Sequence, residues 1–589
     1  MKIELPTQTV GTALLACESA GAWKFTFETL PETECGIEKL RIRLAAPAAT
    51  TPPKFSVEFQ VPAIGACHLW SWRNERAAFP PDWGGHVATN IAMGLPVFAF
   101  VGQDDGNRIA VACSEAKRTL WSQIGLREEG AELFFRFSFF ADPEAPIDSY
   151  ETTLRIDRRA LHFSEAVRES AAWLDSLPGF GACTPPADAF EPLYSTWYNF
   201  QQNVFADTIE AECAEAAKDG MKVIILDDGW QTDDTGRGYG FTGDWEVSKR
   251  RFPDMAAHVA RVHAMGMKYM VWFAVPFIGV HSKVHDRFLG KFLYTRPDGT
   301  ADVLDPRFPE VREYLVSVYG KALREWDIDG FKLDFIDSFR IERDPAEADG
   351  FAGRDIRSVP EAVDRLLGEI RSRLLAIKPG LLFEFRQNYI GPTIRRYGNM
   401  LRATDCPADI FANRSRIANL RLTSGISSVH SDMLEWHPGE TVETAAHQVL
   451  ACLFATIQYS MALHRLPAEH RAMIRHWIRF TTEHREALLR GGFRPHGAAS
   501  GYPILESWSD AERILAVYDP AVVCEPACDG RTLYLVNATG RASIPVRLTA
   551  EPRSVEAFDT CGASVPAPAL RAGLQDAAVP DSGYLAIRF

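Results

Sequence analysis

The chain has 589 residues, of which 46% are hydrophobic and 24% charged, and its formal net charge is −14. This length exceeds what a single hydrophobic core supports and predicts two to four domains. The acidic balance argues against a nucleic-acid partner, which favours a basic face. No stretch reaches the roughly 18 apolar residues that span a bilayer, so we expect no membrane insertion.

The N-terminal segment has no basic stretch leading into an apolar run, so we expect no signal peptide. The 11 cysteines are odd in number and scattered, and the close pair Cys524 and Cys528 matches no zinc spacing. Free thiols in a reducing compartment are the simplest explanation, and we therefore expect a cytoplasmic protein. The sequence leaves open whether the chain forms a homo-oligomer.

Residues 1–180 are expected to form an N-terminal β-sandwich domain. Short alternating runs, such as residues 23–27 and 133–139, are bounded by Pro, Gly and Asp turns. Trp70, Trp72 and Trp83 belong to an aromatic, loop-like insertion in this region. That insertion is either plain surface or leans over an active site, in this chain or in a second subunit.

Residues 181–492 have a different texture, in which short hydrophobic runs alternate with amphipathic segments of helical length. Eight such units over roughly 290 residues predict a catalytic (β/α)₈ TIM barrel, with an open doubly wound sheet as the alternative. The expected strands lie near residues 194–198, 223–228, 269–274, 331–334, 381–385, 400–403, 426–430 and 457–461. Residues 493–589 return to short alternating strands and predict a small C-terminal antiparallel β domain. The fold class is therefore α/β, with β domains on both sides of the barrel.

The segment at residues 331–337 is central to the functional interpretation. Lys332 and Asp334 alternate with apolar residues, so a strand places both charged side chains on one face. One interpretation is a buried ion pair that holds the strand end. The other is catalytic, because reacting groups in barrel enzymes lie at the carboxyl ends of the strands.

The other predicted strand ends are also polar. The residues at these ends are Asp227, Asp228, Trp230, Trp272, Glu384, Arg386, Arg402, Asp405, His430 and Asp432. Together with Lys332 and Asp334 on the fourth strand, polar residues mark the ends of six consecutive strands. This arrangement indicates a polar ligand and carboxylates with shifted pKa values.

Glycoside hydrolysis requires two carboxyl groups that face each other across the scissile bond. We expect Lys332 to favour the ionised form of Asp334, and the charge of Asp334 to raise the pKa of Asp405, with Arg402 opposing in part. Two βα units separate the two aspartates, so both can meet at the carboxyl end of the barrel.

Six motifs together resemble glycoside hydrolase family 36 of clan D, whose members are mainly α-galactosidases. The motifs are Leu-Asp-Asp-Gly-Trp at 226–230, Gly-Asp-Trp at 243–245, Arg-Phe-Pro-Asp at 251–254, Met-Gly-Met-Lys at 265–268, Phe-Lys-Leu-Asp-Phe at 331–335 and Arg-Ala-Thr-Asp at 402–405. The order of the three domains also fits, so the resemblance covers essentially the whole chain.

The resemblance implies a retaining, exo-acting α-galactosidase that needs no metal or organic cofactor, with Asp334 as the nucleophile and Asp405 as the acid/base. It implies that Asp227 and Asp228 bind sugar hydroxyls, although strand alternation turns only one of them inward unless the turn begins between them.

It also implies that Lys332 holds the 3- or 4-hydroxyl, Arg402 the 2-hydroxyl, and Trp230 or Trp272 forms a hydrophobic wall; for these two tryptophans core packing is the alternative. Arg386 and Asp432 complete the predicted substrate-binding set.

The fifth strand departs from the family pattern. Residues 383–388 read Phe-Glu-Phe-Arg-Gln-Asn, where many members carry small residues including Cys, Ser and Gly. Glu384 and Arg386 share a face and predict either an internal salt bridge or a contact between Arg386 and an anionic sugar.

The alternatives to an α-galactosidase are a retaining enzyme for another glycone, neutral or anionic, a transglycosylase, and a non-catalytic sugar-binding protein. The substrate would be an α-linked oligosaccharide or glycoside. His281, His285 and His430 have no supporting ligand cluster, so we expect no metal site.

Overall fold

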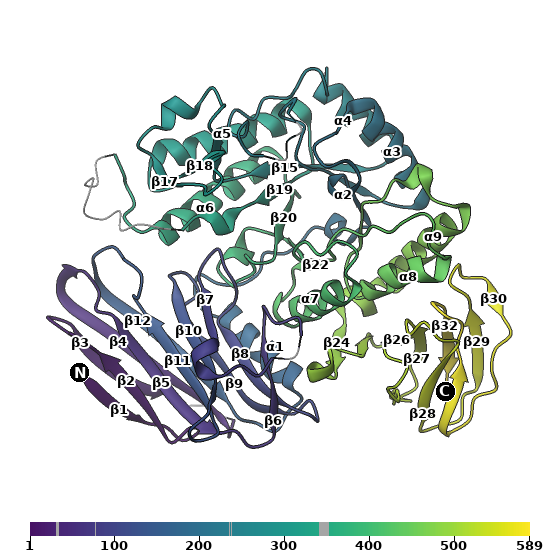
Figure 1. Cartoon of the computed structure of the whole chain (residues 1–589), viewed down its shortest axis with the longest axis horizontal. Helices are drawn as coiled ribbons and strands as arrows, with labels where there is room; N and C mark the ends of the chain where they lie inside the picture. Colours follow the sequence, from purple (N-terminus) through teal and green to yellow (C-terminus); the bar gives the residue numbers. More distant parts are fainter. Residues whose placement is uncertain (31–33, 77, 235, 237, 341–352) are drawn as a thin grey trace.

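The structure, a computed structural model, describes residues 1–30, 34–76, 78–234, 236, 238–340 and 353–589. A β-sandwich at the N-terminus, a central barrel and a β domain at the C-terminus follow one another along the chain (Figure 1). The predicted fold class, a TIM barrel between two β domains, is confirmed. The boundaries at residues 180 and 492 stay predictions.

Two six-stranded antiparallel sheets build the N-terminal domain. The first contains β1 (Lys2–Pro6), β2 (Thr12–Cys17), β5 (Phe55–Pro62), β11 (Glu132–Phe139), β10 (Leu120–Arg127) and β7 (His86–Thr89). The second contains β3 (Lys24–Leu30), β4 (Ile37–Thr50), β12 (Ile147–Asp157), β9 (Asn107–Cys113), β8 (Val97–Gly102) and β6 (Ala66–Ser71). In β11, buried Phe135, Phe137 and Phe139 alternate with partly exposed Arg136 and Ser138, because successive side chains of a strand point to opposite faces.

Eight parallel strands form the barrel, and all eight lie where the sequence predicted them, mostly shorter than expected. They are β13 (Leu193–Ser195), β14 (Val223–Leu226), β15 (Lys268–Ala274), β19 (Gly330–Asp334), β20 (Leu382–Arg386), β21 (Met400–Arg402), β22 (Ser428–His430) and β23 (Gln458–Tyr459). Bridges from His430 to Thr456 and from Leu434 to Tyr459 join the first and last strands of the sheet order. This closure excludes the open doubly wound sheet.

Helices surround the barrel, so its strands are covered on the outer face and packed with side chains inside. All four residues of β14, Val-Ile-Ile-Leu, consequently have no exposed area. The helices are α2 (Trp197–Phe200), α3 (Ala206–Asp219), α4 (Met255–Ala264), α5 (Pro309–Trp326), α6 (Val359–Ile377), α7 (Ile410–Thr423), α8 (Val442–Ala451) and α9 (Ala468–Glu483). A small sheet of β16 (Phe277–Gly279), β18 (Ala301–Leu304) and β17 (Phe292–Thr295) occupies the connection after β15.

The N-terminal domain shares a hydrophobic core with the barrel. Helix α1 (Phe163–Asp175) follows β12, and its Phe163 and Leu174 pack in one buried cluster with Val97 of β8 and with the barrel residues. A separate cluster fills the space between the two sheets of the sandwich. The N-terminal domain is therefore attached to the barrel through a continuous apolar interface.

The C-terminal domain has its own core. Its larger sheet contains β24 (Gly492–His496), β25 (Ile504–Trp508), β26 (Glu512–Val517), β27 (Thr532–Asn537), β32 (Tyr584–Arg588), β29 (Ser554–Phe558) and β30 (Ser564–Val565). Strands β28 (Ser543–Leu548) and β31 (Gly573–Ala578) pair separately.

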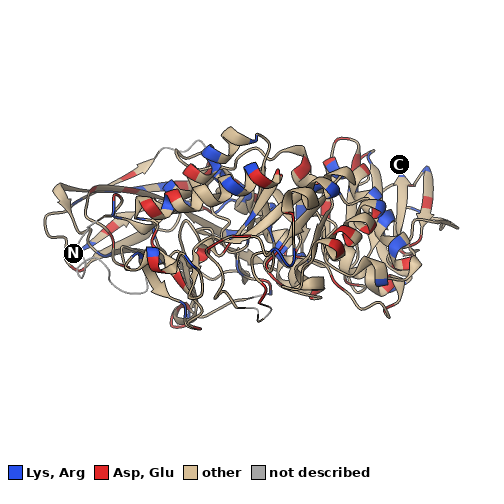
Figure 2. Cartoon of the chain, turned by 90° about the horizontal axis from the view of Figure 1, so that it is seen from above, with Lys and Arg blue, Asp and Glu red and all other residues tan. Residues whose placement is uncertain are grey.

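Charged residues of both signs are interspersed along the length of the molecule (Figure 2). None of the helices in the described ranges is both long and apolar enough to pass through a membrane. The eleven cysteines are all free thiols, and six of them are buried.

Candidate active site

The carboxyl ends of the parallel strands bring the predicted polar residues to one end of the barrel. Strand register sets their depth: Lys332 of β19 is level with Trp272 of β15 and Glu384 of β20, and Arg386 is level with Arg402 of β21. Asp334 ends β19 opposite Ala274. The carboxylates and cations of this end therefore form two layers, one inside the barrel and one at its rim.

Asp334 is surrounded by donors that favour its ionised form. Its Oδ1 accepts hydrogen bonds from Arg386 Nε at 2.7 Å and the Tyr389 hydroxyl at 3.3 Å, and its Oδ2 accepts one from Trp272 Nε1 at 3.0 Å. Burial alone would raise the pKa of Asp334, but Arg386, followed by Lys332 and the Trp272 N–H, holds it well below the usual range. The side chain is only 11% exposed. It is thus an oriented, ionised carboxylate.

The residue after Asp334 takes an uncommon backbone conformation. Phe335 has a φ of 63°, in the left-handed region, and its backbone N–H donates to Asp334 Oδ1 at 2.8 Å. A non-glycine residue in this region costs on the order of 1 kcal/mol or more and persists where neighbours impose it. The Phe335 ring packs against Phe277 and Tyr239, with centroid distances of 4.7 and 5.0 Å.

Lys332 has a different direct partner from the one expected. Its Nζ lies 2.5 Å from Asp227 Oδ2, inside the barrel, and both side chains are buried. Burial lowers the pKa of Lys332, yet the charge of Asp227 outweighs it and the pKa is raised. Lys332 therefore acts on Asp334 at longer range, while Arg386 makes the direct ion pair.

Asp228 has different side-chain partners from its neighbour Asp227. Its two carboxylate oxygens accept hydrogen bonds from Gln202 Nε2 at 2.7 Å and Gln231 Nε2 at 2.6 Å. Burial raises the pKa of Asp228 to about 6, against the effect of these donors. Strand β14 ends at Leu226 and the turn begins at Asp228, so strand alternation does not apply to this pair; Asp227 pairs with Lys332, whereas Asp228 binds two amides.

Asp405 lies beyond the end of β21, and its side chain is 54% exposed. Arg402 Nη2 lies 2.9 Å from its Oδ1. Partial burial and the charge of Asp334 both raise the pKa of Asp405, but Arg402, followed by Lys332, outweighs them and lowers it. The prediction of a raised pKa for Asp405 is wrong: Asp334 acts in the expected direction, but the guanidinium of Arg402 in contact has the stronger effect.

Asp432 is fully buried and already bound to protein groups. It accepts hydrogen bonds from the Tyr198 hydroxyl at 2.8 Å and the Cys406 N–H at 2.6 Å, and it also pairs with Arg402. Burial raises its pKa, with Arg402 opposing. Asp432 consequently supports Arg402 and the turn after Asp405.

The predicted salt bridge between Glu384 and Arg386 is wrong. Glu384 lies in the inner layer, where its Oε2 accepts a hydrogen bond from Gln458 Nε2 at 2.5 Å and its Oε1 is 3.5 Å from Arg402 Nε. Arg386 lies at the rim and pairs with Asp334 and, at 3.4 Å, with Asp337. Two residues along a strand share a face but differ in depth by about 6.5 Å, so neighbouring strands supply the closer partners.

The two tryptophans of the predicted wall have different positions. Trp230 has no exposed area, donates from Nε1 to the Trp272 carbonyl at 3.0 Å, and packs on Trp245 and Trp326 in the core. The preceding Gly229 has a φ of 114°, and a Cβ there would lie 2.6 Å from backbone atoms of Gln202, so the turn before Trp230 requires glycine. Trp230 is therefore a core residue and not a wall for a sugar, whereas Trp272 contacts Asp334 directly.

The aromatic insertion of the N-terminal domain contacts the barrel mainly through buried groups. Trp70 Nε1 donates to Asn419 Oδ1 of α7 at 3.0 Å, and the Trp72 carbonyl accepts from Gln387 Nε2 at 3.0 Å. Both rings are buried, whereas Trp83 is 66% exposed. The insertion thus contacts the loop after β20 and helix α7.

Tyr389, Tyr198 and Asp337 were not predicted as site residues, yet the structure brings them to it. Tyr389 contacts Asp334, Tyr198 contacts Asp432, and Asp337 pairs with Arg386. Asp337 lies in the segment that the sequence marks as central, so its proximity to Asp334 was a usable signal. Tyr389 lies in the loop after β20 and Tyr198 in the one-turn helix α2. Both segments are too short for a periodicity that marks the direction of a side chain.

One cluster in the described part of the chain has the spacing of metal ligands, and it lies outside this site. Ligand atoms of Asp105, His162 and His496 lie within 4.8 Å of one another. Asp105 accepts backbone N–H bonds from Gly497 and Ala498, and His496 Nε2 lies 3.1 Å from Glu506. The sequence interpretation considered other histidines and missed this cluster, which joins the N-terminal domain to the start of the C-terminal domain.

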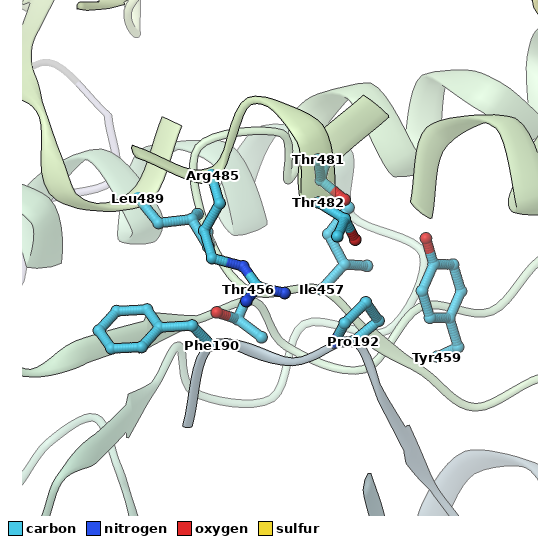
Figure 3. Close-up of a pocket in the computed structure, with 10 residues that line it drawn as sticks. Phe190, Pro192, Thr456, Ile457, Tyr459, Thr481, Thr482, Arg485 and Leu489 are labelled. Atoms are coloured by element: carbon cyan, nitrogen blue, oxygen red, sulfur yellow. The ribbon is translucent and has the colours of Figure 1, made fainter. Parts of the chain in front are cut away.

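A small pocket lies at the opposite, amino end of the barrel strands (Figure 3). Pro192 and Ile457, which directly precede β13 and β23, line it, and the side chain of Arg485 reaches across it (Figure 3). Arg485 pairs with Glu191 at 2.9 Å. Because its lining residues include no carboxylate, this pocket offers no acid or base for hydrolysis.

Comparisons with known proteins agree with the motifs. A family model described as Melibiase matches residues 190–349. The α-galactosidase Mel36A of Lactobacillus acidophilus is 28% identical over 205 residues, which cover 32% of this chain and 26% of that protein. The alignment thus spans about a quarter of the length of this curated relative.

Solved structures match over a larger part of the chain. The α-galactosidase of Lactobacillus brevis has a TM-score of 0.64 at 14% identity, covering 100% of this chain and 83% of that one. The family 36 α-galactosidase AgaA of Geobacillus stearothermophilus, solved with stachyose, has a TM-score of 0.64 at 15% identity with the same coverage. The chain is therefore similar to family 36 α-galactosidases in its barrel sequence and in its fold.

Proposed function

We propose that the protein is a retaining α-glycoside hydrolase that releases galactose from α-galactosides, with Asp334 as the nucleophile and Asp405 as the general acid/base. The observation that carries the proposal is the oriented, ionised Asp334 at the end of β19, two strands away from the half-exposed Asp405. The α-galactosidases that resemble this chain in part of its sequence and in its fold support this choice of chemistry.

The reaction follows from the opposite environments of the two carboxyl groups. Asp334 attacks the anomeric carbon and forms a glycosyl-enzyme ester while Asp405 protonates the departing oxygen. Asp405 then removes a proton from water, which displaces Asp334 and returns the anomeric centre to the α configuration. The N–H of Trp272 and the guanidinium of Arg386 hold Asp334 in place for both steps.

The acid role requires Asp405 to be protonated, although Arg402 lowers its pKa in the free protein. A sugar bound over this half-exposed carboxyl excludes water from it, and burial raises the pKa of a carboxyl group. The basic limb of kcat, which reports the bound state, should therefore lie at higher pH than that of kcat/KM, which reports the free enzyme. Coincident basic limbs would contradict this account.

The charges of the site favour a neutral sugar over the anionic alternative. Lys332 is paired with Asp227, Arg386 with Asp334 and Asp337, and Arg402 with Asp405 and Asp432. These pairs contain five carboxylates and three cations, so a carboxylate or sulfonate on the glycone would have to displace one of the pairs and would add to the excess of negative charge. The α-galactosidase AgaA, solved with stachyose and with raffinose, points to neutral α-galactosyl oligosaccharides as the substrate class.

The test is hydrolysis of 4-nitrophenyl α-galactoside by the wild-type protein, Asp334→Ala and Asp286→Ala. Asp286 is the matched control, since its side chain is 93% exposed. We expect turnover by the wild type and the control, and a loss of at least about 10³-fold for Asp334→Ala, because removing a covalent nucleophile removes the reaction path. A loss within about tenfold would reject Asp334 as the nucleophile.

Proton NMR of the first product distinguishes retention, which releases α-galactose, from inversion. The same reaction with raffinose present as an acceptor measures transfer against hydrolysis. Binding of galactose by a folded protein without any turnover would indicate a non-catalytic sugar-binding protein.

A further inference from the structure

We propose that Glu75 of the N-terminal domain and Arg416 of the barrel form a pair that positions Asp405. The inference rests on the proposed function, because it assigns these residues a role in the acid/base step. Both are positioning residues, since they act through the backbone of the Asp405 segment and not on the reacting atoms.

Helix α7 connects the two domains at the site. Asn413, Arg416 and Asn419 are three residues apart, so they lie on neighbouring positions of one helix face. Asn413 Oδ1 accepts a hydrogen bond from the Asp432 N–H at 3.0 Å. At the other end of this face, Asn419 Nδ2 donates to the Asn74 carbonyl of the N-terminal insertion at 2.9 Å. The face thus runs from the turn after β22 to the N-terminal domain.

Arg416 lies in the middle of that face and contacts both sides. Its Nη1 donates to the carbonyl oxygens of Thr404 at 2.8 Å and Asp405 at 2.9 Å, and its Nε donates to Glu75 Oε1 at 2.6 Å. The Arg416 side chain is 14% exposed and that of Glu75 34%. A single guanidinium therefore joins a carboxylate of one domain to the backbone of the proposed acid/base in the other.

The segment around Asp405 depends on such side-chain contacts. Strand β21 ends at Arg402, so Thr404 and Asp405 lie outside the sheet. Their carbonyl oxygens bond to Arg416, and the next N–H, of Cys406, bonds to Asp432. A displacement of about 1 Å in a catalytic group can reduce a rate by about 10²-fold. Loss of Arg416, or of the carboxylate that orients it, should therefore affect the step in which Asp405 transfers a proton.

The experiment compares kcat/KM for phenyl and 2,4-dinitrophenyl α-galactosides. Dinitrophenolate leaves without protonation, whereas phenolate needs the acid, so misplacing Asp405 should slow the phenyl substrate selectively. We expect Arg416→Ala and Glu75→Ala to lose about 10²-fold and about tenfold on the phenyl substrate, and less than about threefold on the dinitrophenyl substrate. Arg416→Lys and Glu75→Gln, which keep a donor and an acceptor, should recover part of the loss.

Lys117→Ala is the matched control. Lys117 of the N-terminal domain pairs with Asp364 of the outer helix α6 at 2.7 Å, so this variant also removes an ion pair between the domains but leaves the Asp405 segment untouched. We expect both substrates to be hydrolysed at wild-type rates. If the Arg416 and Glu75 variants lose equal activity on both substrates, or behave like Lys117→Ala, the positioning role is overturned.

Asp405→Ala separates the failure of this inference from the failure of the proposed function. If Asp405→Ala shows the selective loss and the Glu75 and Arg416 variants do not, only the positioning role is rejected. If Asp405→Ala itself shows no dependence on the leaving group, Asp405 is not the acid and both proposals are rejected. Thermal unfolding and circular dichroism establish that each variant is folded. If Arg416→Ala does not fold, the Glu75 variants test the proposal, because Glu75 is more exposed and its substitution is less disruptive.

Discussion

The ends of β19 and β21 carry the two proposed catalytic carboxyl groups in contrasting environments. Asp334 is 11% exposed and bound by Arg386, Trp272 and Tyr389, whereas Asp405 is 54% exposed and pairs with Arg402 outside the sheet. The nucleophile must be ionised whenever it attacks, and a buried set of hydrogen-bond donors can keep it in that form. An acid/base must gain and lose a proton in each cycle, which suits a carboxyl group that keeps access to water.

The largest effect that tests this contrast is the loss of the acid. Asp405→Ala should reduce kcat/KM for phenyl α-galactoside by about 10²- to 10⁴-fold, while dinitrophenyl α-galactoside still forms the glycosyl-enzyme. Added azide, which attacks without a base, should then restore turnover and yield galactosyl azide, detectable by mass spectrometry. If neither the selective loss on the phenyl substrate nor the rescue by azide were observed, Asp405 would not be the acid/base that the contrast with Asp334 assumes.

The next effect concerns the charge that keeps Asp334 ionised. Arg386→Met removes the strongest influence that lowers the pKa of Asp334, while burial continues to raise it. The pKa should therefore rise, and the acid limb of kcat/KM should move to higher pH. Below that limb, kcat/KM should fall by about tenfold for each pH unit through which the limb moves, because only the ionised carboxylate attacks.

The control for Arg386→Met is Arg396→Met. Arg396 is 40% exposed and pairs with Asp364, which is not one of the carboxylates of the candidate active site. Its pH profile should match that of the wild type. If the acid limb of Arg386→Met were unchanged, Lys332 and Trp272 would be sufficient to keep the pKa of Asp334 low without Arg386.

Trp272 and Trp230 provide a paired test of site against core. Trp272→Phe removes the N–H donated to Asp334 Oδ2 and should lower kcat/KM by about tenfold, as expected for a hydrogen bond to a charged group. Trp230→Phe should leave kcat/KM within about threefold of the wild-type value. It should lower the free energy of unfolding by about 1–3 kcal/mol, because a smaller phenyl ring replaces a fully buried indole. If Trp230→Phe instead lowered kcat/KM and Trp272→Phe lowered only the free energy of unfolding measured by chemical denaturation, Trp230 would be the residue that contacts the sugar.

A separate effect, on the pH dependence of stability, involves Asp228. Its pKa of about 6 in the folded protein exceeds the ordinary value of 3.8, so the folded state keeps a proton that the unfolded state releases between these values. The free energy of unfolding should therefore fall as the pH rises through this window, by up to about 3 kcal/mol from this group. Asp228→Asn should flatten that part of the profile in denaturation experiments at pH 4 and pH 7.

Local sequence patterns were sufficient for much of the fold. The alternation of short apolar runs with amphipathic segments located all eight barrel strands, because buried parallel strands and their covering helices leave distinct periodicities. The same patterns placed Asp227, Lys332, Asp334 and Arg402 at one end of the barrel, since strand ends are readable one strand at a time.

The partners of these residues depend on contacts between strands and between domains. Lys332 pairs with Asp227 and Arg386 with Asp334 because of strand register and depth, which no single segment encodes. Trp230 is in the core because it packs on Trp245 and Trp326, which other segments supply.

Local patterns in the chain are thus enough to specify the barrel, its order between two β domains and the carboxylate-rich end. The folded arrangement is needed to show which cation controls each carboxylate and how Glu75 reaches Arg416, 341 positions along the chain. Periodicity reports which face of an element is buried, whereas ion pairs and hydrogen bonds depend on distances of about 3 Å between groups that the folded chain alone brings together.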